Sequence, residues 1–222
     1  MASDFEQFLD FLGVNQVALI GYSVGGCFAM AVAQQLKERI SHLTLLSSMG
    51  QFKTMSDLDG MMPMFRMMLG LGRYTPSIAM SFMRIALRSM RKNPNRYYKQ
   101  IIDNIPQVDR EILSCPELKN LYVYSTYESV RQGERDMLLE QLMIAKDWGF
   151  SVEDVSVPVT LWHGELDNYV PADMARKLAK KLPNSRLKLI PGAGHFLLYR
   201  IWDDIVSSLK EQVTVPAMVL TQ

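Results

Sequence analysis

The segment from Leu19 to Gly26 constrains the fold of this chain more than any other stretch. It reads Leu-Ile-Gly-Tyr-Ser-Val-Gly-Gly, and its core fits the pattern G-x-S-x-G. A short β-branched and apolar run (16–20) precedes the pattern, and a helix-forming run with almost no charge (27–36) follows it. The sequence therefore predicts a strand, a tight turn and a helix, with Ser23 presented on the turn as a nucleophile. Glycines suit this turn because it is strained and the helix must pack close against the strand.

Strands and helices are expected to alternate on both sides of this turn. A first helix is expected from about residue 3 to residue 12. Its apolar face comprises Phe5, Phe8, Leu9 and Leu12. Further strands are expected at 42–47, 157–162 and 186–190, and further helices at 27–37, 171–182 and 196–212. The β-α-β order implies an α/β fold with a parallel sheet and right-handed crossovers.

The middle of the chain, residues 49–153, loses the strand signals and has the pattern of helices interrupted by prolines. An insertion of roughly a hundred residues is far longer than an ordinary connection. Insertions of this kind usually cover an active site as a lid. We therefore expect three parts, a first core segment (1–48), a helical cap (49–153) and a second core segment (154–222).

Two further residues complete a candidate catalytic set. A serine hydroxyl is a poor nucleophile until a base takes its proton, and that base needs an acid to orient it. Asp167 and His195 each lie in a loop that follows a predicted strand, where sites in open parallel sheets form. Glu165 is the alternative to Asp167 as the acid. We interpret His163 as a support of the loop that carries the acid rather than as a catalytic residue.

The chain resembles the α/β-hydrolases that carry a helical cap. The resemblance rests on Gly-Tyr-Ser-Val-Gly-Gly at 21–26, Trp-His-Gly-Glu-Leu-Asp at 162–167 and Pro-Gly-Ala-Gly-His at 191–195. It implies a nucleophile at Ser23, a general base at His195 and an orienting acid at Asp167. It also implies that the Val24 N–H is one donor of an oxyanion hole.

The same resemblance implies an activity and its alternatives. The expected function is hydrolysis of a small or medium apolar ester through an acyl-enzyme, without a cofactor. Resembling proteins with this triad also cleave amides or carbon–carbon bonds or perform perhydrolysis, and the triad does not separate these reactions. A serine at position 23 argues against dehalogenase and epoxide-hydrolase chemistry, for which resembling proteins use an aspartate.

The chain departs from the family at its beginning. Resembling proteins have several strands before the serine strand, and a loop among them supplies a second oxyanion-hole donor. Here only one helix precedes the serine strand. We therefore expect an N-terminally truncated sheet with this strand at its edge, which a second copy could cover as a homodimer. The alternative function is that of an impaired hydrolase acting as a binding or interaction module, or of an inert fragment.

Composition excludes several other classes. The net charge of +1 gives no reason to expect a nucleic-acid partner, and two cysteines are too few for a disulfide framework. The three histidines are scattered, so no metal site is expected. We expect Cys27 to be a small core residue and His42 to be structural or superficial. The chain begins without the pattern of a signal peptide and contains no membrane-spanning run, so we expect a cytoplasmic protein.

The expected cap carries two compositional clues to its partners. Nine of the sixteen methionines lie between Met55 and Met90, which indicates either a surface that adapts to apolar ligands or ordinary core packing. Residues 60–102 hold eight basic side chains and no acidic one, and Arg84, Arg88 and Arg91 share a helical face. Such a face could meet an anionic membrane surface, although a solvated face is the more common interpretation.

Overall fold

The computed structural model describes residues 2–133 and 135–213, and its centre is a parallel four-stranded sheet. The strands are β1 (Val17–Tyr22), β2 (Ile40–Leu46), β3 (Val159–Gly164) and β4 (Ser185–Ile190). They lie side by side in chain order, and every neighbouring pair is parallel. The α/β class predicted from the sequence is therefore confirmed.

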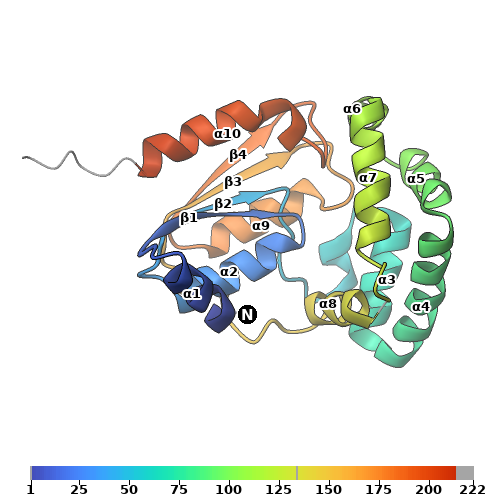
Figure 1. Cartoon of the computed structure of the whole chain (residues 1–222), viewed down its shortest axis with the longest axis horizontal. Helices are drawn as coiled ribbons and strands as arrows, with labels where there is room; N and C mark the ends of the chain where they lie inside the picture. The colour runs from blue at the N-terminus through green and yellow to red at the C-terminus, as the bar shows by residue number, and fades with distance from the viewer. Residues whose placement is uncertain (1, 134, 214–222) are drawn as a thin grey trace, which may run out of the picture.

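Helices cover both faces of the sheet. On one face lie α1 (Ala2–Phe11), α2 (Gly25–Gln35) and α9 (Ala172–Lys181), whereas α10 (Leu198–Val213) lies on the other (Figure 1). The main core forms between the sheet and the first face, where Met30, Ala33 and Leu43 are fully buried. This packing holds the strands rigidly, so the loops at their carboxyl ends start from fixed positions.

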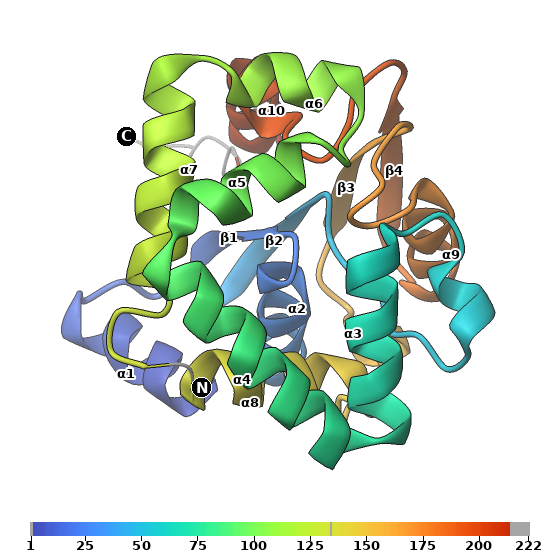
Figure 2. The same ribbon diagram turned by 90° about the vertical axis from the view of Figure 1, so that its right-hand side faces the viewer.

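The connection between β2 and β3 is helical. It contains η1 (Met55–Leu58), α3 (Pro63–Tyr74), α4 (Pro76–Lys92), α5 (Pro94–Ile102), α6 (Gln107–Leu113), α7 (Pro116–Glu128), α8 (Arg135–Ala145) and η2 (Val152–Asp154). Four of these helices begin at a proline, because the fixed φ of proline suits the first helical position and its missing N–H costs nothing there. Helices α3 to α8 lie beyond the carboxyl ends of the strands (Figures 1 and 2), whereas η2 packs against α2 and α9 in the main core. The division into 1–48, 49–153 and 154–222 remains a prediction.

Some expected boundaries and contacts differ from the structure. Strand β3 extends through His163 and Gly164, two residues beyond the expected end. The first helix is present, but Phe8 and Leu12 on its expected apolar face are 54% and 51% exposed. Of the four residues on this expected apolar face, only Leu9 is buried, because α1 contacts the rest of the protein chiefly through α2.

The strand that carries the serine turn lies at the edge of the sheet, as expected. Among the described residues, β1 pairs with β2 alone. Its outer backbone groups are therefore available to another strand, and the homodimer stays a prediction. No helix in the described ranges has the length and apolar character needed to cross a membrane.

Candidate active site

Ser23 occupies the turn between β1 and α2 in a conformation that few side chains adopt. Its φ is +54°, in the left-handed region that non-glycine residues avoid. Three backbone hydrogen bonds hold the turn. The Ser23 N–H donates to the Leu46 carbonyl (2.9 Å), and the Ser23 carbonyl accepts from the N–H groups of Gly26 and Met49 (both 3.2 Å). Such strain persists only where the surrounding structure fixes it, and it concentrates at functional sites.

Two glycines permit this turn by allowing a close approach of helix and strand. A Cβ on Gly21 would lie 2.7 Å from the Gly26 Cα, and a Cβ on Gly26 would overlap the Ser48 hydroxyl. A Cβ on Gly25, in contrast, would meet nothing within 4 Å. The close packing expected from the sequence is therefore present, but Gly26 rather than Gly25 is the helical residue that it requires.

Asp167 and His195 form a buried hydrogen-bonded pair. His195 Nδ1 lies 2.8 Å from Asp167 Oδ2, and the two residues are 4% and 5% exposed, respectively. The other carboxylate oxygen, Oδ1, accepts the backbone N–H groups of Tyr169 and Val170, both at 2.9 Å. Because both carboxylate oxygens are engaged, the orientation of the imidazole ring is fixed.

The positions of Glu165 and His163 bear on which residues assist His195. Glu165 is exposed, whereas Asp167 contacts His195 directly. The Nε2 of His163 lies 2.8 Å from the Val170 carbonyl and 3.5 Å from Asp167 Oδ2. Burial lowers the pKa of His163, which favours a neutral ring that donates to Val170 and braces the acid loop.

The remaining histidine and the first cysteine lie in the protein interior. His42 is buried and lies 3.1 Å from the Thr160 hydroxyl, so its place is structural rather than superficial. Cys27 is also buried, and burial raises its pKa to about 12. A thiol in this environment is inert, in agreement with its expected place in the core.

Ser23, Val24 and His195 line one cavity of about 280 Å³ at the carboxyl ends of the strands. The rest of its wall is mostly apolar and includes Met49, Met61, Phe65, Met68, Leu69, Ile144 and Phe196. Within the described residues the Val24 N–H donates no hydrogen bond, so it is available to a ligand in this cavity.

The structure adds Asp109, on α6, which the sequence did not indicate. Its carboxylate accepts the backbone N–H groups of His195 (2.8 Å) and Phe196 (3.1 Å) and is completely buried. Burial raises the pKa of Asp109 more than these hydrogen bonds lower it. A Cβ on Gly194 would overlap this carboxylate, so the glycine before the histidine permits the contact. A helix of the insertion thus holds the loop that carries His195.

Two further contacts shape the surroundings of His195. The ring of Tyr169 stacks on the imidazole with 4.5 Å between centroids and 19° between planes. A Cβ on Gly164 would overlap the Ala193 carbonyl oxygen, so this glycine at the end of β3 lets the loop that carries His195 approach the strand. Both contacts join residues that are distant in sequence, and neither follows from a local pattern.

The site has no side-chain set that fits a metal ion. Within the described ranges, no group of three or more His, Cys, Asp or Glu side chains is arranged to hold one. The polar side chains that line the cavity are instead the Ser23 hydroxyl, the His195 imidazole with its carboxylate partner, the Gln141 amide and three tyrosines, Tyr22, Tyr122 and Tyr169.

Comparison with known proteins identifies the family. The family model described as alpha/beta hydrolase fold matches residues 1–200. The chain belongs to this family. The resemblance inferred from the three motifs is therefore confirmed, as is the fold class.

The similar proteins include enzymes of more than one activity. The chain is 26% identical over 203 residues to a pimeloyl-[acyl-carrier protein] methyl ester esterase of Aliivibrio fischeri (88% of this chain, 69% of the esterase). It is 22% identical over 202 residues to 2-hydroxy-6-oxononadienedioate/2-hydroxy-6-oxononatrienedioate hydrolase 2 of Pseudomonas putida (88% and 62%). Among solved structures, a hydrolase from Pseudomonas aeruginosa superimposes with a TM-score of 0.66 at 14% identity (96% and 71%).

These relatives and the family support an enzyme of the hydrolase type. The chain spans about two thirds of the length of the two enzymes that it matches in sequence. Their activities therefore guide a proposal for this alpha/beta hydrolase and do not by themselves assign a substrate to it.

Proposed function

We propose that this protein is a serine hydrolase that cleaves small or medium apolar esters through an acyl-enzyme. Ser23 is the proposed nucleophile, His195 the general base and Asp167 the acid that orients it. One observation carries the proposal most strongly: a buried histidine–carboxylate pair, 2.8 Å apart, opens on the cavity that also contains a serine in a strained turn. The similarity to an esterase gives independent support.

The hydrogen bonds define the first chemical step. Because Asp167 accepts at 2.8 Å from Nδ1, the neutral His195 ring carries its proton on Nδ1 and leaves Nε2 free to accept one. Nε2 takes the hydroxyl proton of Ser23 as its Oγ attacks the ester carbonyl. Asp167 then stabilises the imidazolium, and the N–H groups of Tyr169 and Val170 hold its second oxygen in place.

The remaining steps return the enzyme to its starting state. The negative charge that develops on the carbonyl oxygen is stabilised by the Val24 N–H. The imidazolium gives its proton to the leaving alcohol, and the ester bond breaks to leave an acyl group on Ser23. His195 then takes a proton from a water molecule, whose oxygen attacks the acyl carbonyl. The imidazolium returns that proton to Ser23 Oγ as the bond between Oγ and the acyl group breaks and the acid is released.

The wall of the cavity favours an apolar substrate. Apart from the proposed catalytic groups, most of its lining residues carry aliphatic, thioether or aromatic side chains. These side chains favour apolar acyl or alcohol groups, because a buried charge without a partner is costly. The sulphur side chains of Met61 and Met68 can adjust to several shapes.

Hydrolysis of p-nitrophenyl acetate, butyrate and octanoate tests the proposal. We expect turnover by the unaltered protein and a loss of about 10³-fold or more in Ser23→Ala and His195→Ala. Ser56→Ala, which alters an exposed residue of η1 that does not line the cavity, is the matched control. Turnover that survives Ser23→Ala would refute the nucleophile, and a folded chain without any turnover would favour a binding module.

A further inference from the structure

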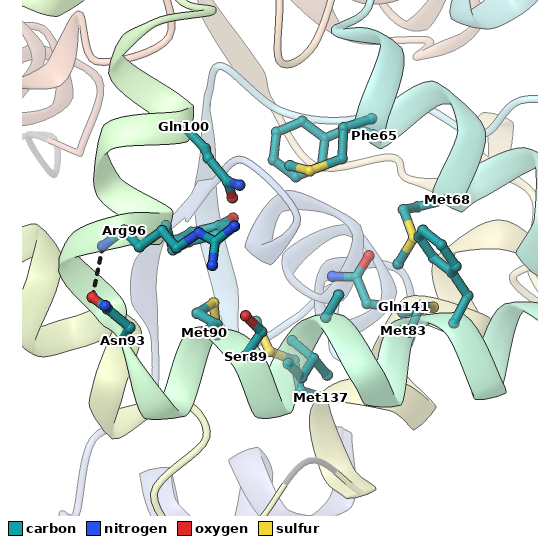
Figure 3. Close-up of a pocket in the computed structure, with 15 residues that line it drawn as sticks. Phe65, Met68, Met83, Ser89, Met90, Asn93, Arg96, Gln100, Met137 and Gln141 are labelled. Atoms are coloured by element: carbon teal, nitrogen blue, oxygen red, sulfur yellow. Dashed lines mark hydrogen bonds between the residues drawn. The ribbon is translucent and has the colours of Figure 1, made fainter.

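A second cavity lies within the helical insertion, between α3, α4, α5 and α8 (Figure 3). Its volume is about 290 Å³, which is close to the lower end of the roughly 300–1,000 Å³ range of small-molecule sites. Most of its wall is apolar and includes Met64, Met68, Met83, Met90, Met137, Phe82 and Leu87. The methionines that the sequence singled out therefore contribute to a cavity as well as to packing.

This cavity adjoins the candidate active site. Phe65, Met68 and Gln141 line both the insertion cavity and the cavity that contains Ser23. A ligand with its reacting carbonyl at the serine would pass these three side chains to reach the insertion cavity. The shared wall is mostly apolar, so the part of the ligand that passes it should be an apolar chain.

One border of the insertion cavity is polar and carries a positive charge. Asn93, Arg96 and Gln100 line it from α5 and the turn before that helix. Figure 3 shows the Arg96 side chain reaching into the cavity and the Gln100 amide directed toward it. The polar end therefore offers a guanidinium and an amide to the same ligand.

In the described part of the chain, the guanidinium of Arg96 has no acidic partner. None of the ion pairs there includes Arg96, and its hydrogen bonds to Asn93 are made by its backbone N–H, which donates to the side-chain oxygen and to the carbonyl of that residue. Residues 60–102 contain no acidic side chain at all. An arginine that borders an apolar cavity without an acid is suited to a carboxylate or phosphate group of a ligand.

We infer that the insertion cavity binds an apolar arm of the ester that ends in an anionic group, with Arg96 as the specificity-determining residue for that group. The inference rests on the proposed function, because it assumes that the reacting ester lies at Ser23. It narrows the substrate class to esters that carry an anionic group at the far end of an apolar chain, and a carboxylate is the anion used in the test. An ester of matching length and no terminal charge would fill the same cavity but leave Arg96 without a partner.

Matched ester pairs test this inference. Monomethyl esters of dicarboxylic acids, from succinate to dodecanedioate, are compared with methyl esters of monocarboxylic acids of equal chain length. Acetate esters of ω-hydroxy acids provide a second series, in which the carboxylate is on the alcohol side. We expect kcat/KM to favour the charged member at one chain length, by about tenfold, because Arg96 is exposed and solvent weakens its attraction.

Substitutions assign the preference to one side chain. Arg96→Gln should lower kcat/KM for the charged esters by about tenfold more than for the neutral esters of equal length, and Arg96→Lys should restore part of the preference. Arg91→Gln is the matched control, because Arg91 is an exposed arginine of α4 that does not line the cavity. Equal effects of Arg96→Gln on charged and neutral esters, or no preference in either series, would overturn the inference.

A binding measurement separates this inference from the proposed function. Monomethyl suberate is titrated calorimetrically into Ser23→Ala and into the double variant that also carries Arg96→Gln. Binding that depends on Arg96 supports the cavity assignment even when no ester is turned over. Turnover of neutral esters that depends on Ser23, together with binding that ignores Arg96, refutes the cavity assignment and leaves the proposed function standing.

Discussion

The substitution Asp109→Asn tests whether α6, a helix of the insertion, positions His195, the proposed general base. The carboxylate of Asp109 accepts the N–H groups of His195 and Phe196 at 2.8 and 3.1 Å. An asparagine retains one acceptor oxygen and presents an NH₂ group to the other N–H. One buried N–H group therefore loses its acceptor, and His195 is no longer held through both the peptide bond that precedes it and the one that follows it.

The size of the effect follows from two opposing contributions. A buried N–H group without an acceptor costs about 1–3 kcal/mol. The neutral amide avoids part of the desolvation that raises the pKa of Asp109, which offsets some of that cost. We expect a net loss of about 1–2 kcal/mol in the free energy of unfolding. For activity, a displaced catalytic group can cost about 10²-fold, so we expect kcat/KM to fall by roughly 10- to 100-fold.

The pH dependence of stability gives a second, independent test of the role of Asp109. The fold raises the pKa of Asp109 above its ordinary value of 3.8, so the folded state binds this proton more tightly than the unfolded state. The stability contributed by this group therefore decreases as the pH rises from about 3.8 through the raised value. Asp109→Asn does not titrate and should lack this decrease.

Urea unfolding and p-nitrophenyl ester hydrolysis measure these effects. Asp103→Asn is the matched control, because Asp103 is an exposed aspartate at the end of α5, outside the hydrogen bonds of the site. If the Asp109→Asn variant keeps the stability and the kcat/KM of the unaltered protein, the contact does not position the loop that carries His195. A loss of stability without any loss of kcat/KM would limit Asp109 to a structural role.

Two other predictions concern the serine turn and the start of the insertion. Gly26→Ala should lower the free energy of unfolding by about 1–3 kcal/mol, because the added Cβ would overlap Ser48. Gly25→Ala should be neutral or slightly stabilising. Equal effects of the two substitutions in urea unfolding would contradict this packing. Lys177 and two backbone N–H groups hold the pKa of Asp57 well below its usual range. Asp57→Asn should therefore lower the free energy of unfolding at neutral pH by about 0.5–1 kcal/mol. The difference in stability between the variant and the unaltered protein should narrow as the pH falls below about 3.8. A difference in stability that does not change with pH would contradict a contribution from the ion pair of Asp57 and Lys177.

Local chemistry explains what the sequence could predict. The positive φ at Ser23 and the close approach of Gly21 to Gly26 are encoded within eight consecutive residues, so the turn could be inferred directly. Prolines similarly mark where helices of the insertion begin. Asp167 and His195 follow strands whose carboxyl ends meet in a parallel sheet, and the structure places their side chains 2.8 Å apart.

Long-range contacts account for what the sequence could not predict. Asp109 is 86 residues from His195 and binds its backbone, so no side-chain pattern identifies the pair. The exposure of Phe8 and Leu12 also depends on what α1 meets in three dimensions rather than on its own periodicity. The second cavity arises where four helices of the insertion meet, and only its methionine-rich and basic composition was visible in the sequence.

The site of covalent labelling by a fluorophosphonate tests the central claim most directly. The probe reacts with a serine that an adjacent base has activated, and mass spectrometry of the digested protein identifies the modified residue. The account predicts a single adduct on Ser23 that disappears in His195→Ala, in which the hydroxyl remains but its base is absent. An adduct on another residue, labelling that persists without His195, or a folded protein that the probe leaves unmodified would contradict it.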